Sequence, residues 1–214
     1  MSNFLTDHLI HRDEDFMVIH KPAGLLSVPG KGEALQDSML TRLLAIEPKT
    51  LLIHRLDRDT SGILVFGLSR FGQNRISRQF QERHTEKTYQ ALVAGSLSGE
   101  GTIDIPVVYD PDRPPLHIVD PQHSKPALTH WQALEQFELA GQVVTRVKLT
   151  PITGRSHQLR VHMQYLGHPI VGDTLYATEQ QQQLTDRLCL HAKQLSFYHP
   201  KTDELLNFEC AVPF

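Results

Sequence analysis

The sequence consists largely of short apolar segments that follow one another without long helical stretches between them. Segments rich in β-branched and aromatic residues, bounded by turn residues, are typical of strands. They occur at 16–19, 51–53, 63–66, 88–93, 129–137, 143–149, 188–197 and 205–210. Parallel neighbours need a long crossover, usually a helix, so this order favours antiparallel pairing. The sequence therefore predicts an α+β fold with a mainly antiparallel mixed sheet flanked by helices.

Helical spacing is confined to a few places. Apolar residues recur at helical intervals from Leu35 to Ile46, and Pro48 ends that pattern. Ser69 is expected to cap a second helix that runs to about His84. The remaining expectations are a helix opened by Thr153 or Ser156 and closed by Gly167, a proline-rich loop at 110–126, and a surface helix or loop at 180–183.

Length and composition indicate a globular protein with a core. The chain has 214 residues, of which 40% are hydrophobic and 21% charged, so we expect one domain over residues 1–214. No apolar run has the length of a membrane-spanning helix, and Met1 to His8 lack the order of a secretion signal. The two cysteines are far apart and form no CxxC pair. We therefore expect a soluble, cytoplasmic protein without a disulfide framework.

Positive charge is concentrated in two segments, although the net charge is -3. The segment 54–87 holds seven basic and four acidic residues, which gives a net charge of +3. The segment 145–170 holds four basic residues and no acid. Such segments are typical of a local basic face that binds phosphate, and ordinary charge fluctuation is the alternative.

The most informative segment is the polar loop His54–Gly62, which lies between two expected strands. Arg55 and Arg58 flank Asp57 in this loop. A cation close in space would keep that carboxylate ionised, as a nucleophile or base requires. A solvated surface loop with weak ion pairs is the alternative.

A second segment of interest, 149–162, contains Gly154 just before an expected helix and Arg155 in the expected first turn of that helix. The free N–H groups of a helix N-terminus favour an anion, whereas a positive side chain in the first turn is unfavourable for the helix dipole. A residue placed against its local preference often serves a functional site. An amphipathic helix with a polar outer face is the alternative.

Metal and nucleotide cofactors are not expected. The chain has 13 histidines, but the spacing of His157 and His162 does not place them on one helical face as HExxH does. Cys189 and His191 have no cysteine pair nearby in the sequence. The sequence contains neither GxxxxGK[ST] nor GxGxxG, the motifs of phosphate and dinucleotide binding.

Several motifs together resemble the RluA-type pseudouridine synthases, and the resemblance covers nearly the whole chain. The loop His54–Gly62 resembles the signature of that family. The other matching segments, in the same order as in the family, are Lys21–Leu26, the strand around Tyr89, Pro151–His162, Gly167–Asp173 and Leu190–Ala192.

The resemblance implies a pseudouridine synthase catalytic fold and the isomerisation of uridine in RNA. The N1–C1′ bond breaks, the base turns, and C5 joins C1′, with no cofactor. Flipping is needed because a stacked uridine is not accessible to a carboxylate. Whether Asp57 attacks carbon or removes a sugar proton stays open. The implied roles are Asp57 as the catalytic carboxylate, Arg155 as its ionic partner, Tyr89 stacking on the base, Leu149 packing under it and Arg55 filling the vacated stack.

The resemblance and the basic segments together indicate the RNA contacts. Many family members carry an N-terminal S4 RNA-binding domain, for which the early position of Lys21-Pro22 leaves no room. This short form resembles members that modify a tRNA anticodon stem-loop at uridine 32 and a 23S rRNA hairpin at uridine 746. We expect a monomer whose RNA-binding residues are Arg58, Arg78, Arg83, His157 and Arg160.

Two other functions are weighed against this one. A glycosidase-like hydrolase would need a second carboxylate in a matching motif, and none is evident. An RNA-binding module of the same fold without catalysis is the second alternative. The presence of Asp57, Tyr89 and Arg155 argues against a loss of catalysis.

Overall fold

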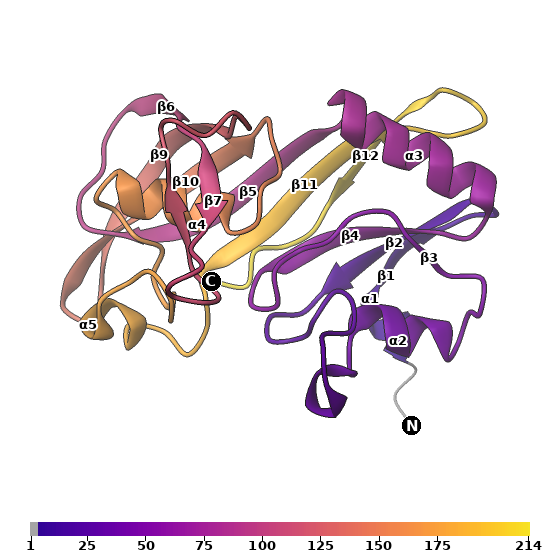
Figure 1. Ribbon diagram of the computed structural model, residues 1–214, viewed down its shortest axis with the longest axis horizontal. Coiled ribbons are helices and arrows are strands. Elements are labelled where there is room, and N and C mark those ends of the chain that lie inside the picture. The colour runs from indigo at the N-terminus through magenta and orange to yellow at the C-terminus, as the bar shows by residue number, and fades with distance from the viewer. Residues whose placement is uncertain (1–3) are drawn as a thin grey trace. The chain divides into compact units, whose positions relative to one another are not determined.

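The computed structural model describes residues 4–214 and divides them into two compact units. Residues 1–3 lie outside the described part. They begin the expected domain over 1–214 and the segment Met1 to His8, in which no secretion signal is expected. The first unit comprises the chain up to Glu86 together with Ala192–Pro213. The second unit comprises Lys87–His191 and Phe214. Figure 1 labels the helices and strands of both units. A single domain over residues 1–214 stays a prediction.

The first unit contains a sheet of mostly short strands. Its strand order is β1-β2-β4-β11, with β3 beside β4 and β12 beside β11. The pairs β1–β2, β2–β4, β3–β4 and β11–β12 are antiparallel. The strand bounds are β1 Leu9–Arg12, β2 Phe16–Lys21, β3 Leu51–Leu52, β4 Ser61–Gly67, β11 Leu190–Tyr198, of which residues from 192 belong here, and β12 Leu205–Glu209.

The helices of the first unit confirm one expected cap and correct one expected helix. The helix α3, Arg70–Glu82, begins where Ser69 accepts the N–H of Gly72 at 2.9 Å. The single helix expected from 35 to 46 is wrong. That segment is divided into a short 3-10 turn, Glu33–Leu35, and α2, Met39–Leu44. The physical reason is Ser38, which is extended and forms a capping box with Thr41. A short helix α1, Phe4–His8, precedes β1.

The sheet of the second unit has the order β5-β10-β9-β6, and all three pairings are antiparallel. The strands are β5 Glu86–Ala94, β6 Glu100–Asp104, β9 Leu128–Leu139 and β10 Gln142–Pro151. The expected hairpin turn between β9 and β10 is confirmed, because Ala140 and Gly141 have φ of 48° and 78°. With these pairings the antiparallel α+β prediction is confirmed.

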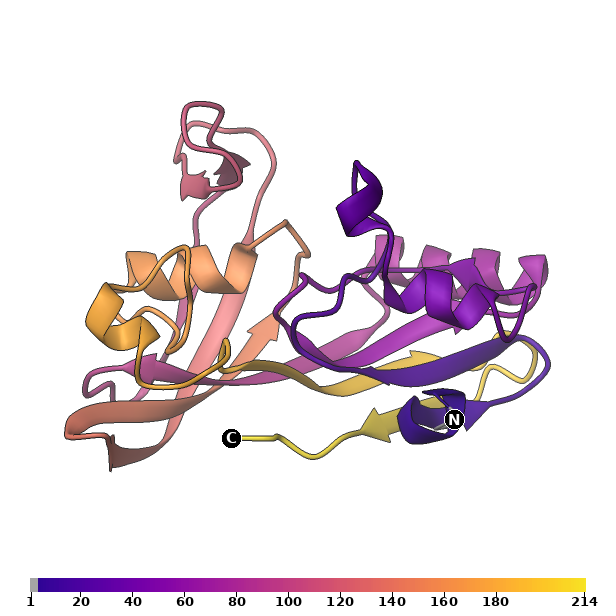
Figure 2. The same ribbon diagram turned by 90° about the horizontal axis from the view of Figure 1, so that it is seen from below.

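A separate hairpin projects from the second unit, and its second strand lies inside the segment expected to be a loop. The strands β7, Val107–Tyr109, and β8, His117–Val119, pair in an antiparallel manner, so the loop expected over 110–126 is wrong at β8. Figure 2 shows this hairpin standing away from the unit's sheet. A tertiary contact accounts for β8, because the hydroxyl of Tyr176 accepts the N–H of His117 at 2.9 Å.

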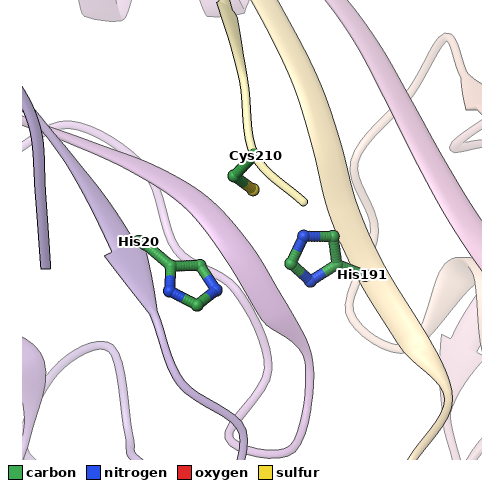
Figure 3. Close-up of side chains that lie close together, drawn as sticks. All are labelled: His20, His191 and Cys210. Carbon is green, nitrogen blue, oxygen red and sulfur yellow. The ribbon is translucent and has the colours of Figure 1, made fainter. Parts of the chain in front are cut away.

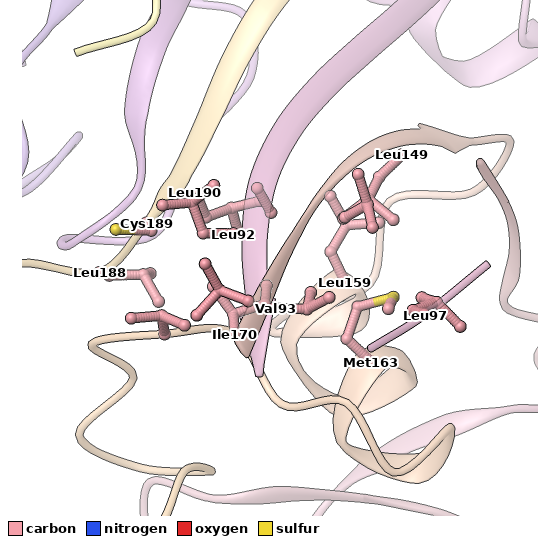
Figure 4. Packing of buried hydrophobic residues seen from close by; sticks show 14 of the residues in the cluster. Leu92, Val93, Leu97, Leu149, Leu159, Met163, Ile170, Leu188, Cys189 and Leu190 are labelled. Carbon is pink, nitrogen blue, oxygen red and sulfur yellow. The ribbon is translucent and has the colours of Figure 1, made fainter. Parts of the chain in front are cut away.

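The helix α4, Gln158–Tyr165, covers one face of this sheet, and a short helix α5, Glu179–Gln182, follows later in the chain. Figure 4 shows Leu159 and Met163 of α4 among the buried side chains of β5 and β10. The expected caps Thr153 and Ser156 are wrong, since the N-cap is His157. Gln158 explains this, because its Oε1 accepts the Thr153 hydroxyl at 2.8 Å and the Arg155 N–H at 3.0 Å.

Two features concern the general expectations, namely the membrane-spanning potential of the helices and the state of the two cysteines. Between residues 4 and 214, none of the helices has the length and apolar character needed to cross a membrane. Neither Cys189 nor Cys210 forms a disulfide bond. Burial raises the pKa of Cys189, and it raises the pKa of Cys210 to about 11, so both thiols are protonated at neutral pH.

Gly62 is the position in the first unit where a side chain is least acceptable. It has φ of 120°, and a Cβ there would overlap the backbone nitrogen and oxygen of Ala192. We expect Gly62→Ala to lower the free energy of unfolding by about 2–4 kcal/mol, measured by urea unfolding. The control is Gly154→Ala, since no atom lies within 4 Å of a Cβ there. Equal stability of the two variants would contradict this account.

Candidate functional site

The loop that carries Asp57 belongs to the first unit and is fixed at several of its backbone atoms. Asp57 is partly buried, and its carbonyl oxygen accepts the N–H of Thr60 at 3.2 Å, which closes a turn. Thr60 and Ser61 are buried, whereas Arg55 and Arg58 are exposed. The loop therefore presents its charged side chains from a backbone that the unit holds in place.

Lys21 is the main attachment of this loop. Its side chain is completely buried, at 0% exposure, and its ammonium donates to three carbonyl oxygens. The acceptors are Pro22 at 2.8 Å, Leu25 at 2.7 Å and Arg58 at 2.8 Å. A buried ammonium is stable only when its hydrogen-bonding capacity is used. Lys21 thus ties the turn after β2 to the residue that follows Asp57.

Ser27 and His54 hold the other end of the loop. The Ser27 hydroxyl donates to the carbonyl of Leu56 at 2.6 Å and accepts its N–H at 3.0 Å. The ring of His54 accepts the N–H of Val65 at 3.1 Å and stacks on Phe80 of α3, with centroids 4.4 Å apart. The backbone on both sides of Asp57 is therefore anchored to β4, α3 and the turn after β2.

The predicted RNA-binding arginines of the first unit lie on its surface. Arg58 pairs with Asp59, with Nε to Oδ1 at 3.0 Å. Arg78 pairs with Glu82 at 2.7 Å on the outer face of α3, and this carboxylate raises the pKa of Arg78. Arg83 is exposed and ends α3 in a left-handed conformation, with φ of 61°. Exposed ion pairs are weak, so these arginines can exchange their partners for phosphates.

In the second unit, Tyr89 and Leu149 occupy directly opposite positions on β5 and β10. Trp131 of β9 is opposite Leu149 on the other side. Directly opposite residues point to the same face of a sheet, so these three side chains form one row. Tyr89 is partly buried, whereas Leu149 is 0% exposed and belongs to the core. Leu149 can therefore support Tyr89 from the neighbouring strand.

Arg155 and His157 lie in the turn before α4, so the expectation that Arg155 occupies the helix's first turn is wrong. Arg155 Nε donates to the carbonyl of Pro126 at 3.2 Å, at the base of the β7–β8 hairpin. His157 adopts a left-handed conformation with φ of 55°, and its Nδ1 lies 2.6 Å from the Tyr176 hydroxyl. Both side chains thus connect α4 to neighbouring segments of the second unit.

Arg160 forms a buried ion pair rather than a surface contact. Its Nε and Nη2 donate to the two carboxylate oxygens of Asp173, both at 2.7 Å. The side chains are 3% and 0% exposed, and the guanidinium lies 5.1 Å from the Tyr176 ring. So buried a side chain offers almost no surface to a phosphate, which weakens the case for the predicted RNA contact of Arg160.

His162 shows how polar groups are accommodated beneath α4. It is fully buried, with Nδ1 at 2.9 Å from the Thr129 hydroxyl and Nε2 at 3.0 Å from the carbonyl of Ile105. Burial lowers the pKa of His162, so the neutral ring is favoured at neutral pH. The histidine of this motif therefore has a structural position between α4, β9 and the hairpin base.

The predicted site residues are divided between the two units. The first unit contains Asp57, Arg55, Arg58, Arg78 and Arg83, and the second contains Tyr89, Leu149, Arg155, His157 and Arg160. Within the second unit, Tyr89 and Leu149 are neighbours in the sheet, as the predicted roles require. Within the first unit, Arg55 and Arg58 flank Asp57 in the anchored loop, while Arg78 and Arg83 belong to α3.

One group of possible metal ligands occurs among residues 4–214. It consists of His20, His191 and Cys210, which Figure 3 shows. His20 and Cys210 belong to the first unit and His191 to the second, so this group supports no metal assignment.

Sequence reasoning missed several residues that shape these segments. Lys21 and Asp173 were part of matched motifs, but their hydrogen-bond partners are distant in the chain and were not predictable. Ser27 carried no signal beyond its polar character. Tyr176 lies between the matched segments Gly167–Asp173 and Leu190–Ala192, and only the fold brings its hydroxyl to His117 and His157.

Comparison with known proteins gives a consistent result. Residues 15–165 match the family model described as RNA pseudouridylate synthase. A Pasteurella multocida protein named dual-specificity RNA pseudouridine synthase RluA is 46% identical over 96% of this chain and 93% of its own length. The Escherichia coli protein of that name is 42% identical over the same shares. The solved structure of human RNA pseudouridylate synthase domain containing 1 is 31% identical, with a TM-score of 0.83 over 97% of this chain and 84% of that chain.

The role of Lys21 can be tested by removing its charge. In Lys21→Met three buried carbonyls lose a donor, so we expect the free energy of unfolding to fall by about 3–5 kcal/mol. The measurement is urea unfolding followed by circular dichroism. Lys49→Met, at an exposed position of the same unit, is the control and should change stability by about 0.5 kcal/mol or less. Wild-type stability in Lys21→Met would show that the ammonium does not hold the loop.

Proposed function

Because this chain belongs to the RNA pseudouridylate synthase family, we propose that it is an isomerase that converts uridine to pseudouridine within structured RNA. The observation that carries the proposal is the anchored loop His54–Gly62, whose sequence resembles the family signature. Lys21 and Ser27 hold the backbone on both sides of Asp57, as a preorganised catalytic carboxylate requires. Family membership indicates the reaction, and the anchored loop contains the proposed catalytic residue, Asp57.

We assign the chemistry to a small number of side chains. Asp57 is the catalytic carboxylate, and Arg155 is its proposed ionic partner. Tyr89 stacks on the flipped uracil, supported by Leu149 on the adjacent strand. Arg55 fills the space that the base leaves in the RNA. These roles rest on the family resemblance and on the positions of the side chains in each unit.

The reaction balances without an external reagent. The glycosidic N1–C1′ bond breaks, a C5–C1′ bond forms, the proton on C5 is lost, and N1 gains a proton. No electrons are transferred to a partner, so the proposal requires no redox cofactor. Removing the base from the stack costs less in a loop than in a duplex, which favours a hairpin substrate.

The proposed substrates are a tRNA anticodon stem-loop and a hairpin of 23S rRNA, and the proposed form is a cytoplasmic monomer. The relatives named dual-specificity RNA pseudouridine synthases support two RNA substrates. Contact with phosphates is assigned to the exposed side chains Arg58, Arg78 and Arg83, and a further RNA contact is assigned to His157. Arg160 is left out of this set because it is buried against Asp173.

Asp57→Asn tests the catalytic assignment. The substitution removes the charge and the reactive oxygen but keeps the size, so we expect an intact fold, wild-type RNA binding and no product in single-turnover assays. The control is Asp37→Asn, an exposed carboxylate of the same unit that pairs with Arg42 and should keep wild-type activity. Substantial product formation by Asp57→Asn would refute the role of this residue.

Short hairpins test the substrate assignment. We expect an isolated anticodon stem-loop and the matching rRNA hairpin to react, with affinity that falls as salt rises because phosphate contacts release counterions. Arg83→Glu should raise KM more than it lowers kcat. It should also reduce the slope of log Kd against log salt by about 1 or more, which is the contribution of one phosphate contact. Arg42→Glu, also in the first unit, is the matched control. If only intact ribosomal particles react, the compact-substrate proposal is wrong.

A further inference from the structure

The β7–β8 hairpin carries an aromatic pair, the exposed Tyr109 and the half-buried His117, that the proposed chemistry does not use. Tyr109 ends β7 and is 51% exposed, which is high for an aromatic side chain. It is directly opposite His117 at the start of β8, and the two ring centroids lie 5.6 Å apart in an edge-to-face arrangement. Figure 2 shows that this hairpin extends from the second unit, away from the unit's sheet.

This pair is one end of a continuous series of rings. The centroid of His117 lies 4.7 Å from that of His157, and His157 lies 5.6 Å from Tyr176. The series therefore runs from the exposed Tyr109 to Tyr176, which is only 7% exposed. His157 belongs to the turn before α4, within the matched segment Pro151–His162. The rings thus connect the hairpin to the segment to which we assign RNA contact.

The hairpin is held rigidly enough to present these rings in one orientation. The Tyr176 hydroxyl accepts the N–H of His117 at 2.9 Å, and Asp110 accepts Arg113 Nε at 2.8 Å within the turn. The Asp110 N–H donates to the carbonyl of Leu116 at 2.9 Å, which closes the hairpin. Preorganised aromatic side chains lose little conformational entropy on binding.

The hairpin is not basic, so its exposed tyrosine is not part of a phosphate-binding surface. Between residues 105 and 127 the acids Asp110, Asp112 and Asp120 outnumber the bases Arg113 and Lys125. A phosphate-binding element would be basic. Nucleobases, by contrast, stack on aromatic faces independently of sequence and without net charge. The hairpin therefore has the chemistry of a base-stacking surface.

From these observations we propose that Tyr109 and His117 form a second nucleobase site, which stacks on an unpaired loop nucleotide of the substrate hairpin other than the target uridine. The proposal rests on the proposed function, since it assumes an RNA hairpin as ligand. It adds an RNA contact on a hairpin that carries neither Asp57 nor Tyr89, and this contact would help select RNA by its loop.

The test measures binding of fluorescently labelled anticodon and rRNA hairpins by anisotropy. We expect Tyr109→Ala to raise Kd about fivefold or more, and Tyr109→Phe, which keeps the ring, to bind as wild type does. The slope of log Kd against log salt should be unchanged, because no charge is removed. One abasic nucleotide in the loop should weaken wild-type binding and abolish the difference between wild type and Tyr109→Ala.

The matched control is Tyr165→Ala, which removes the other exposed tyrosine of the second unit, at 57% exposure. Thermal unfolding verifies that both variants fold. Equal Kd for Tyr109→Ala and Tyr165→Ala, or no abasic position that abolishes the difference, overturns the proposal. Product formation by the wild type is scored separately. A hairpin that binds through Tyr109 but gives no pseudouridine contradicts the proposed function alone, and a product with unchanged Kd contradicts this inference alone.

Discussion

The buried ammonium of Lys21 is the interaction on which the candidate loop depends most. Three main-chain carbonyls from two separate turns converge on one charged group that has no access to solvent. Neither turn has regular structure of its own to satisfy these carbonyls. An apolar side chain would leave them unsatisfied at a cost of about 1–3 kcal/mol each. The conformation around Asp57 is therefore a property of β2 and its turn as much as of the loop itself.

The same principle operates in the second unit with other chemistry. Asp173 neutralises Arg160 inside the protein, and Gln158 organises the turn that carries Arg155. His162 joins β9 to the base of the hairpin as a neutral ring. In each case a buried polar side chain makes hydrogen bonds or an ion pair that regular secondary structure does not supply. These interactions hold the segments around a functional motif in place without apolar packing.

Local sequence predicted what local interactions determine. The alternation in β9 and β10, the turn at Ala140-Gly141 and the Ser69 cap were all readable because nearby residues decide them. Local sequence did not predict β8, which depends on the hydroxyl of Tyr176. It did not predict the break at Ser38, where a capping box competes with helix continuation. It also did not predict the burial of Arg160, which depends on Asp173. The motif residues were identified through the family resemblance, whereas their roles are assigned by proposal.

The row formed by Tyr89, Leu149 and Trp131 has a practical consequence. Trp131 is the one tryptophan of the chain, and it is partly buried on the strand next to Leu149. Its indole packs so closely over Gly101 that a Cβ there would lie 3.0 Å from three ring atoms. The chain thus carries a single tryptophan fluorophore, separated from Tyr89 by one side chain. Its emission is a built-in optical reporter of packing beside that tyrosine, and no label needs to be attached to obtain it.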